Sequence, residues 1–473
     1  MQRLAWLPFA LLLWWTWSIA LRPISVPDEG RYAGVARDMM AHGDWLVPRL
    51  NGLPFFHKPP LFYWIDASAM SLFGVGPATA RIGSAIAALI ACWAVGWHAR
   101  RVGGQAAMRA TLLVLCTMPL YFFGGQYANL DMLVGALITA CVVCWAGALD
   151  PGGAGDDAAA RRRYACIGWA AAALAILAKG LIGLVLPLLV LGPWALWHWR
   201  GRWLAGLRFL LDPLGLVIFA VIVAPWFVAM AQRFPDFLDY FFIEQHFRRY
   251  LGSSFNNRQP LLFYPAVLAV LLLPWSLLLV AALRRRGQAT VPASPFRSLW
   301  IWWAVAISLF FSAPASKLVG YILPAVPPLA LLAGSWLAMP GRERWLRGGA
   351  LLAALVCVGG VFGARQWDTK SLRELPPVMR AAATADPAWR DVPMVFIEAP
   401  HFEVPLLLDA KVLPWVVKNW DDPKVQQVDS WPKELFDAAR FDPEQGRRVL
   451  LKPQDLLARL CTTQRAWILA PLQ

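Results

Sequence analysis

The sequence predicts a polytopic α-helical membrane protein that ends in a small α/β domain. Of its 473 residues 59% are hydrophobic and 15% are charged, whereas soluble domains are about half apolar and about one quarter charged. Long apolar runs recur through residues 1–364. Residues 365–473 are rich in proline and charge and contain short strand patterns instead. These observations separate a membrane domain, 1–364, from a C-terminal α/β domain, 365–473.

A membrane-spanning helix needs about 20 mainly apolar residues, and about eleven runs approach this length. The runs are 4–22, 81–99, 109–125, 131–149, 164–178, 181–199, 209–231, 260–283, 299–313, 318–339 and 346–364. We expect the first run to be a span, because no small-residue cleavage site of a signal peptide follows it. Only Lys179 and Gly180 separate the fifth run from the sixth. One helix over both would be about 54 Å long, nearly twice the hydrocarbon thickness, so a tight hairpin is expected.

The arginines indicate the orientation of the chain. Alternate loops, counted from the N-terminus, carry 17 arginines and no lysine. Lys and Arg in short loops stay on the cytoplasmic side, so these loops are expected inside. The arginines are Arg3, Arg100, Arg101, Arg109, Arg161, Arg162, Arg163, Arg200, Arg202, Arg208, Arg284, Arg285, Arg286, Arg297, Arg342, Arg344 and Arg347. Loops 23–80 and 232–259 and the tail from residue 365 are then expected on the outer side.

The tail alternates short strand patterns with helical ones. Strands are expected at 392–397, 404–408, 449–451 and 467–469. A helix is expected at 453–460, because proline favours the first position of a helix.

The net charge of +15 does not indicate nucleic-acid binding, because the basic residues lie between apolar runs. The sequence also has no GxGxxG or P-loop motif and no DxD pair in a soluble domain, so no nucleotide-binding fold is expected.

Lysine is rare and unevenly placed. Before Lys370 the sequence contains only Lys58, Lys179 and Lys317, and the predicted topology places all three at outer ends of spans. An ammonium group at the membrane boundary suits a lipid phosphate. The alternative for any single lysine is snorkelling to the interface.

The first outer loop contains two further candidate sites. Asp28 and Glu29 are adjacent carboxylates behind a proline, where Asp28 suits the N-cap of a helix along the interface. Lys58 stands before Pro59 and Pro60, which favour a helix start with free N–H groups. This second half of the loop is therefore a candidate phosphate site.

These stretches resemble a known family. DEGRYA at 28–33, GDWLVPRLNG at 43–52 and KPPLFYW at 58–64 are similar to the first outer loop of bacterial aminoarabinose transferases. Those enzymes move 4-amino-4-deoxy-L-arabinose from undecaprenyl phosphate to lipid A, and they are related to protein O-mannosyltransferases. Later matches, which run to about residue 330, are GQYANLD at 125–131, AKG at 178–180, FFIEQHFRRY at 241–250, RQP at 258–260, SKL at 316–318 and YILP at 321–324.

The resemblance implies a GT-C fold with its active site between the first outer loop and the membrane. Asp28 would match the essential carboxylate of the family, and Lys58 and Tyr321 its contacts to the donor phosphate. The catalytic candidates are Asp28, Glu29 and Asp131. The candidates for binding the donor phosphate or substrate are Arg31, Lys58, Lys179, Arg258, Lys317 and Tyr321.

A metal site is an open alternative. The family often has an acidic residue before the lysine that matches Lys58, and with a histidine matching His246 it can hold a metal ion. Here that neighbour is His57. Two imidazoles suit Zn²⁺, and Glu244 could add an oxygen ligand. The plain alternative is an interfacial polar histidine, so no cofactor is required.

The expected function is transfer of a sugar, such as an amino sugar, from undecaprenyl phosphate to lipid A or a related glycolipid. The expected place is the periplasmic face of a bacterial inner membrane. Transfer to protein hydroxyls is the alternative. A transporter is less favoured, because transporters commonly show inverted repeats and place their sites near the bilayer midplane. The tail of about a hundred residues is short for the family, which leaves the sugar and the acceptor open.

Overall fold

The computed structural model describes residues 13–26, 28–150, 157–198, 208, 210–248, 257–284, 295–367, 372, 374–389 and 391–471. The beginning of the first apolar run and the side chain of His246 lie outside the described residues. The chain divides into two compact units. The first unit comprises Met1–Ser18, Ser84–Phe227 and Asn257–Gly363, and the second comprises Ile19–Gly83, Val228–Asn256 and Ala364–Gln473.

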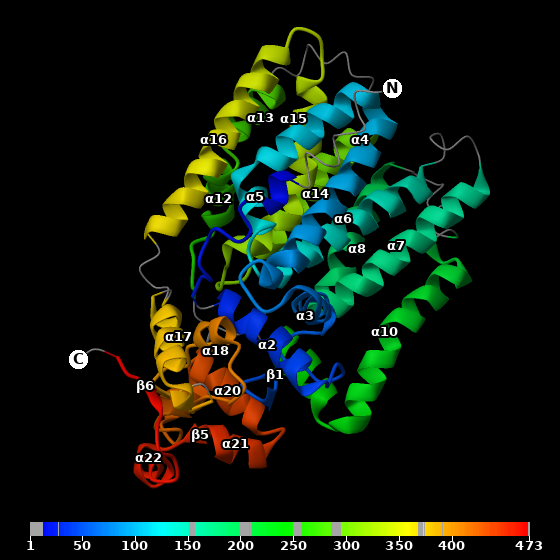
Figure 1. Ribbon diagram of the computed structural model, residues 1–473. Coiled ribbons are helices and arrows are strands. Elements are labelled where there is room, and N and C mark those ends of the chain that lie inside the picture. Colours follow the sequence, from blue (N-terminus) through cyan, green and yellow to red (C-terminus); the bar gives the residue numbers. More distant parts are fainter. Residues whose placement is uncertain are drawn as a thin grey trace. The chain divides into compact units, whose positions relative to one another are not determined.

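The first unit is a bundle of helices, several of which lie side by side (Figure 1). In chain order they are α4 (Ile82–Thr117), α5 (Pro119–Gly124), α6 (Leu130–Leu149), α7 (Ala158–Lys179), α8 (Ile182–His198), α10 (Pro213–Arg233), α12 (Phe263–Leu271), α13 (Trp275–Arg284), α14 (Pro295–Ser312), the 3₁₀ helix η5 (Val319–Ala325), α15 (Val326–Leu337) and α16 (Glu343–Trp367).

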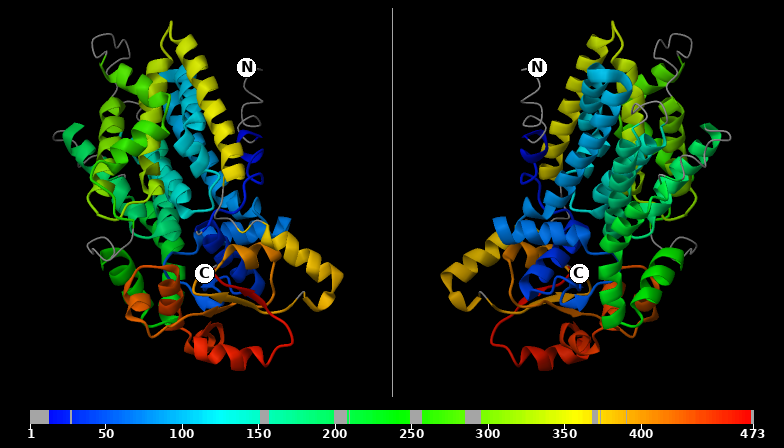
Figure 2. Two further views of the ribbon diagram at one scale, coloured as in Figure 1. Left: turned by 90° about the vertical axis from the view of Figure 1, so that its left-hand side faces the viewer. Right: turned by 90° about the vertical axis from the view of Figure 1, so that its right-hand side faces the viewer.

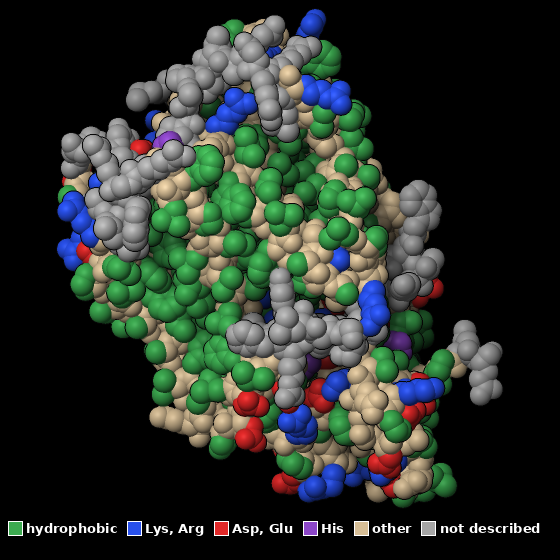
Figure 3. All heavy atoms as spheres, turned by 180° about the vertical axis from the view of Figure 1, so that it is seen from behind, with side chains coloured by type: hydrophobic (Ala, Val, Ile, Leu, Met, Phe, Trp, Pro, Cys, Tyr) green, Lys and Arg blue, Asp and Glu red, His purple; other side chains and the backbone are tan. Residues whose placement is uncertain are grey.

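Helix α6 forms the centre of this bundle. All of its residues are buried, and it contacts α7, α8 and η5. By contrast, α10 and α16 expose apolar side chains, among them Val221 and Leu351. Hydrophobic side chains also cover much of the surface in Figure 3, with few charged residues among them. An apolar outer surface on apolar helices is what a bilayer accommodates.

Five helical segments of the described residues are long and apolar enough to cross a membrane, or six if the bent pair α12 and α13 is one span. That pair occupies the expected run 260–283 but bends by 104° at its break. Run 81–99 lies almost entirely in α4, which is interrupted at Gly104 (φ +72°). Run 109–125 begins in α4 and continues through α5. The expected turn at Lys179 and Gly180 is confirmed, since α7 ends there and α8 begins at Ile182. The count of eleven spans stays a prediction.

The second unit combines short helices with two small sheets. Its elements are α2 (Asp28–His42), the antiparallel strands β1 (Arg49–Leu50) and β2 (Leu53–Pro54), α3 (Leu61–Phe73), the 3₁₀ helix η2 (Thr79–Arg81), the π-helix η3 (Asp239–Arg248), α17 (Leu375–Ala385), the 3₁₀ helix η6 (Pro387–Trp389), β3 (Met394–Ile397), α18 (Glu403–Leu408), β4 (Trp415–Val417), α19 (Pro423–Gln427), α20 (Trp431–Ala439), α21 (Pro443–Val449), β5 (Leu450–Leu451), α22 (Pro453–Leu460) and β6 (Trp467–Leu469). The expected helices at residues 28 and 453–460 are confirmed.

Strands β3 to β6 form one parallel sheet in the order β5-β4-β3-β6. One face, with Val395, Trp415 and Leu451, packs against Leu456 and Leu460 of α22. The opposite face, with Phe396 and Val416, lines a cavity of about 20 Å³ together with residues of α2, β1 and α18. Figure 2 shows α22 on one side of this sheet and α2 on the other. Helix α2 of the first loop therefore completes the second helical layer that a parallel sheet needs.

One expected strand is wrong. Residues 404–408 belong to the helix α18, because Pro405 has no N–H for a sheet ladder but is accommodated in the first turn of a helix. The helix stops at Asp409, which has a left-handed backbone (φ +47°). In the sheet β3 lies between β4 and β6. Strand β4 consists of three residues that the sequence analysis did not predict as a strand.

Candidate active site

Helix α2 carries the first three candidate residues. Asp28 and Glu29 stand in its first turn, where the positive end of the helix dipole favours acidic side chains. Glu29 is fully buried, whereas the side chain of Asp28 is 28% exposed. The two adjacent carboxylates thus occupy different environments.

Arg31 connects Asp28 to the C-terminal part of the chain. Its Nη2 donates to Oδ1 of Asp28 at 2.8 Å and to the hydroxyl of Tyr32 at 3.1 Å. Its Nη1 donates to Oε1 of Glu434 on α20. Burial lowers the pKa of Arg31, but the nearby Glu434, Tyr32 and Asp28 outweigh it and raise the pKa further above its usual value. The guanidinium is therefore a permanent cation between two carboxylates.

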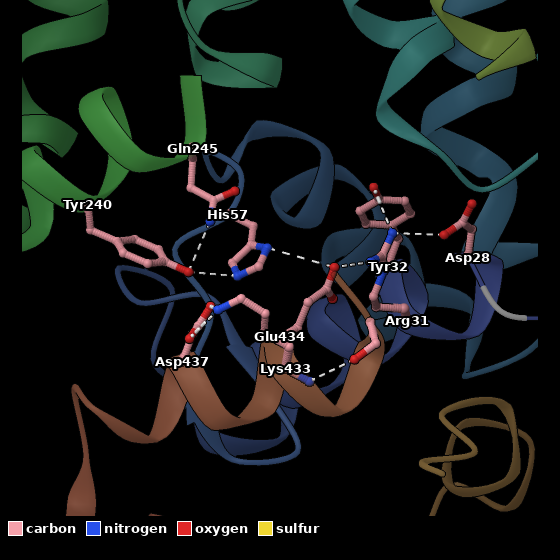
Figure 4. Close-up of polar contacts among 10 residues, drawn as sticks. Asp28, Arg31, Tyr32, His57, Tyr240, Gln245, Lys433, Glu434 and Asp437 are labelled. Carbon is pink, nitrogen blue, oxygen red and sulfur yellow. Dashed lines mark hydrogen bonds and ion pairs between the residues drawn. The ribbon is translucent and has the colours of Figure 1, made fainter. Parts of the chain in front are cut away.

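A polar chain continues from Glu434 (Figure 4). Oε1 of Glu434 lies 3.8 Å from Nδ1 of His57, and Nε2 of His57 lies 2.8 Å from the hydroxyl of Tyr240. Gln245 Nε2 donates to that hydroxyl at 3.1 Å. Burial, with the negative charge of Asp437 nearby, raises the pKa of Tyr240 well above its usual value, so its hydroxyl stays protonated. These polar contacts join residues of loop 23–80, of loop 232–259 and of the C-terminal part of the chain.

Glu29 has a separate partner. Arg81 Nε donates to its Oε1 at 2.8 Å, and Arg81 Nη2 donates to its Oε2 at 2.7 Å. Arg81 also donates to the carbonyl oxygens of Ile19, Arg22 and Pro23. Burial alone would raise the pKa of Glu29, but the charge and hydrogen bonds of Arg81 lower it to about 2. This bidentate pair fixes the start of α2 to the end of the loop.

The first unit contains a second cluster. Asp131 stands in the first turn of α6, where the side chain of Asn129 caps the helix by accepting from the Asp131 N–H at 3.0 Å. Its Oδ1 accepts from Lys179 Nζ, and Nζ lies 4.4 Å from the ring centre of Tyr321. Gly320 allows this approach, since a Cβ there would meet Asp131 Oδ2 at 2.2 Å. Lys179 is thus held between a carboxylate and an aromatic face.

Lys317 and Arg258 lie on two paired segments of the same unit. Arg258 and Ser316 form an isolated antiparallel bridge, and Lys317 Nζ donates to the carbonyl of Gln259 at 2.9 Å. Lys317 is buried and Arg258 is exposed. Tyr264 supports the turn by donating to the carbonyl of Leu318 at 3.0 Å.

Known proteins resemble this chain in sequence and in fold. Residues 9–241 match the family model for dolichyl-phosphate-mannose-protein mannosyltransferases. The undecaprenyl phosphate-α-4-amino-4-deoxy-L-arabinose arabinosyl transferase of Edwardsiella ictaluri is 33% identical over 369 residues, which cover 76% of this chain and 65% of that enzyme. The chain is a relative of the aminoarabinose transferases.

Other aminoarabinose transferases give the same result. The enzyme of Pseudomonas aeruginosa is 34% identical over 69% of this chain and 58% of its own length. The crystal structure of ArnT from Cupriavidus metallidurans bound to undecaprenyl phosphate superposes with a TM-score of 0.77 at 26% identity, over 97% of this chain and 91% of that one. Together with the apolar helices, these relatives identify the chain as a multi-pass membrane protein.

The extent of the likeness differs among these proteins. The chain spans less than two thirds of the length of the curated aminoarabinose transferases, with 65% of the Edwardsiella ictaluri enzyme covered. The archaeal oligosaccharyltransferase AglB from Archaeoglobus fulgidus has a TM-score of 0.51 at 13% identity, so it shares the fold alone.

The structure brings some predicted site residues together within each unit. Asp28 and Arg31 are in contact in the second unit, and Asp131, Lys179 and Tyr321 are in contact in the first. Lys58 is half-buried and lies before α3, which begins at Leu61 behind two prolines as expected. These roles remain predictions drawn from the resemblance to aminoarabinose transferases.

The proposed metal ligands have other contacts where they are described. Glu244 lies 3.8 Å from Arg440, and His57 contacts Tyr240 and Glu434. No group of three His, Cys, Asp or Glu side chains within the described ranges could hold a metal ion. The described residues alone therefore do not form a metal site.

Sequence reasoning missed Glu434, Tyr240 and Arg81. The sequence could have marked Arg81 as a candidate, because it is a lone arginine at the predicted outer end of an expected span. Glu434 had none, since it lies 403 residues after its partner Arg31.

Proposed function

We propose that the chain is a glycosyltransferase that moves a sugar from undecaprenyl phosphate to lipid A or a related glycolipid. We further propose that the sugar is an amino sugar such as 4-amino-4-deoxy-L-arabinose. The observation that carries this proposal is 33% identity, over 76% of the chain, to an enzyme named for that donor and that sugar. The likeness to a structure that holds undecaprenyl phosphate supports the choice of lipid carrier.

The cations of the first unit suit the phosphate of the donor. As the bond to the sugar breaks, negative charge grows on the leaving phosphate oxygen, and fixed cations and hydroxyl donors lower the barrier most at that point. Lys179, Lys317, Arg258 and Tyr321 are proposed for this task, together with Lys58 from the first loop. The contact of Lys179 with Asp131 fixes its ammonium group in place.

Asp28 is proposed to act on the reacting sugar or the acceptor. A phosphate acceptor is already ionised near neutral pH, because the second pKa of a phosphomonoester is about 6, and it needs no base. Asp28 would then orient the acceptor or the amino group of the sugar, or stabilise positive charge that develops on the sugar ring. Its contact with Arg31 holds the carboxylate in one orientation.

We propose a periplasmic site in a bacterial inner membrane. The 17 arginines of alternate loops support a cytoplasmic position for those loops. With about eleven spans, loops 23–80 and 232–259 and the α/β domain at 365–473 would then lie outside.

Zinc is a further proposal, with His57, His246 and Glu244 as its ligands. Imidazole nitrogen and carboxylate oxygen are ordinary zinc ligands. The described side chains do not by themselves form the site, so no step of the proposed reaction depends on a metal.

Transfer to protein hydroxyls is the second candidate, and the match of residues 9–241 to protein mannosyltransferases favours it. A serine or threonine hydroxyl is a weak nucleophile and would need Asp28 as a base, a role typically worth about 10²- to 10⁴-fold in rate. The many cations favour the phosphate acceptor instead, because two phosphorylated lipids would meet there.

Mass spectrometry of cellular products separates these candidates. Lipid A from a strain that overproduces the protein should carry an added amino sugar on phosphate, and lipid A from a strain without the gene should not. Unchanged lipid A together with sugar on secreted proteins would overturn the proposal in favour of protein glycosylation.

A further inference from the structure

We infer that Glu434 is a positioning residue for the transfer: it orients Arg31, and Arg31 in turn orients Asp28. The inference rests on the proposed function. It assigns a task in the reaction to the C-terminal part of the chain, which contains none of the sequence motifs that the sequence analysis compared with the family.

Helix α20 delivers Glu434 to this place. The side chain of Ser430 caps the helix by accepting from the Lys433 N–H, and a proline stands in the first turn. Leu435 and Ala438 of the same helix are buried. Because both its N-terminus and its apolar side are fixed, α20 holds the backbone of Glu434 in one position.

The Glu434 carboxylate has little contact with water. Its side chain is 7% exposed and that of Arg31 is 11% exposed. Oε1 accepts from Arg31 and lies 3.8 Å from His57, while Oε2 is buried and makes no hydrogen bond to any described residue. Two opposite charges attract each other strongly in such a water-poor environment. Removing one of them leaves the other charge buried and unpaired.

The geometry of the guanidinium makes the two contacts of Arg31 dependent on each other. The group is planar and rigid, so the direction of one nitrogen sets the direction of the other. Nη1 is held by Glu434, and Nη2 points to Asp28 at 2.8 Å. Without Glu434, Nη1 loses its carboxylate while Nη2 keeps its contacts with Asp28 and Tyr32. The guanidinium can then turn about these contacts, and the orientation of Asp28 changes with it.

Glu434 is not the main attachment between α2 and the tail. Arg37 Nη1 donates to the carbonyl of Pro405 at 2.6 Å, and Asn51 Nδ2 donates to that of Pro414 at 3.1 Å. These buried bonds join the first loop to the tail independently of α20. A change at Glu434 should therefore alter the active site more than the fold.

The test measures transfer by the purified full-length protein from an undecaprenyl-phosphate amino sugar to lipid A. Glu434→Gln keeps an acceptor oxygen of the same shape but removes the charge, and we expect kcat/KM to fall about tenfold. For Glu434→Ala we expect a loss of about 10²-fold, the scale of a misplacement of about 1 Å in an active site. The fall should lie in kcat, because the proposed role of Asp28 belongs to the transition state. Glu444→Gln, which alters an exposed ion pair of α21, is the matched control and should keep the wild-type rate.

A double-mutant cycle with Arg31→Lys decides whether Glu434 acts through Arg31. Lysine keeps the charge but lacks the fork that reaches two carboxylates, so Glu434→Gln should slow the Arg31→Lys protein little further. In the same four proteins, the effects of the two changes on the unfolding temperature should not add. This measurement does not require activity.

A wild-type rate in Glu434→Gln, or additive effects of the two changes, would overturn the inference while the proposed function stands. An inactive wild-type protein would overturn the proposed function itself, whatever the variants do.

Discussion

The two adjacent carboxylates at the start of α2 bind different arginines and therefore differ in their properties. Both oxygens of Glu29 are bound by Arg81 in a fully buried pair. Asp28 shares Arg31 with Glu434 and is 28% exposed. A carboxylate whose oxygens are all occupied suits a structural task, whereas a partly exposed one can reach a substrate. We therefore expect Asp28 to be catalytic and Glu29 to be needed for the fold.

Glu29→Gln tests the structural role. The pKa of Glu29 falls from 4.5 to about 2 in the folded protein. A lowered pKa contributes stability that is fully present above the unfolded value of about 4.5 and is lost as the pH falls toward about 2. At about 1.4 kcal/mol per pKa unit, the contribution at neutral pH is about 3 kcal/mol. The variant should therefore unfold at a lower temperature at pH 7, with a smaller further loss between pH 5 and pH 3.

The control for this experiment is Glu398→Gln, which removes an exposed pair with Lys418 and should change the unfolding temperature little. Wild type and Glu29→Gln with the same acid dependence would show that Glu29 does not have this role.

Elemental analysis of purified protein tests the zinc proposal. Wild-type protein should contain zinc in a fixed ratio, and a His57→Ala, His246→Ala double variant should contain much less, because two of three ligands are gone. Equal metal content in both proteins would remove the proposal.

Contacts among the candidate residues differ in how far local sequence accounts for them. Asp28 and Arg31 stand three positions apart on one helix, so their contact follows from helical spacing. Glu434 and Tyr240 reach the same place only through tertiary folding, and no local pattern marks them. The motifs on which the sequence analysis based the family resemblance did not supply Glu434 either, because they end at about residue 330.

At the scale of elements, α2 depends on two glycines that differ in their surroundings. A Cβ on Gly30 would lie 2.8 Å from the backbone nitrogen of Glu403, whereas a Cβ on Gly34 would lie 3.7 Å from a methyl group of Leu50. The first distance is too short for any real contact with a backbone atom, and the second is ordinary packing. Gly30 therefore sets how closely α2 approaches α18.

Replacing each glycine by alanine tests this approach. Gly30→Ala should destabilise the protein by about 1–3 kcal/mol, as overpacking does, and should also reduce activity because α2 carries Asp28. Gly34→Ala is the matched control, and it should be neutral or stabilising by up to about 1 kcal/mol through better helix propensity. Equal unfolding temperatures for the two variants would contradict the close packing of α2 on α18.

Elements with strong end signals were predicted well. Helix α22 begins at its proline, and α3 begins directly after Pro59 and Pro60. The strand expected at 404–408 was wrong because its apolar pattern is short enough to fit a single helical turn as well as a strand. Strand β4 was missed because three residues are too few to show an alternating pattern.

At the scale of the whole molecule, sequence order and spatial grouping differ. The second unit gathers two loops and the tail from three separate stretches of the chain. Hydropathy located the apolar runs but not their breaks, since α12 and α13 share one run and bend by 104°. A local average of hydropathy contains no information about a bend.

Reporter fusions test the membrane topology. A fusion at Gly287 should be active only as a cytoplasmic reporter, and one at Gln473 only as a periplasmic reporter, because the arginine-rich loops stay inside. A periplasmic signal at Gly287 would reverse the scheme.

The most direct test of the central claim is transfer by purified protein in a defined membrane. Vesicles would contain the protein, undecaprenyl-phosphate 4-amino-4-deoxy-L-arabinose and lipid A, and the products would be read by mass spectrometry. We predict lipid A with one added amino sugar for the wild type and a loss of at least about 10²-fold for Asp28→Asn, which keeps the shape of the side chain but not its charge. Unmodified lipid A with the wild-type protein, or equal product with Asp28→Asn, would contradict the account.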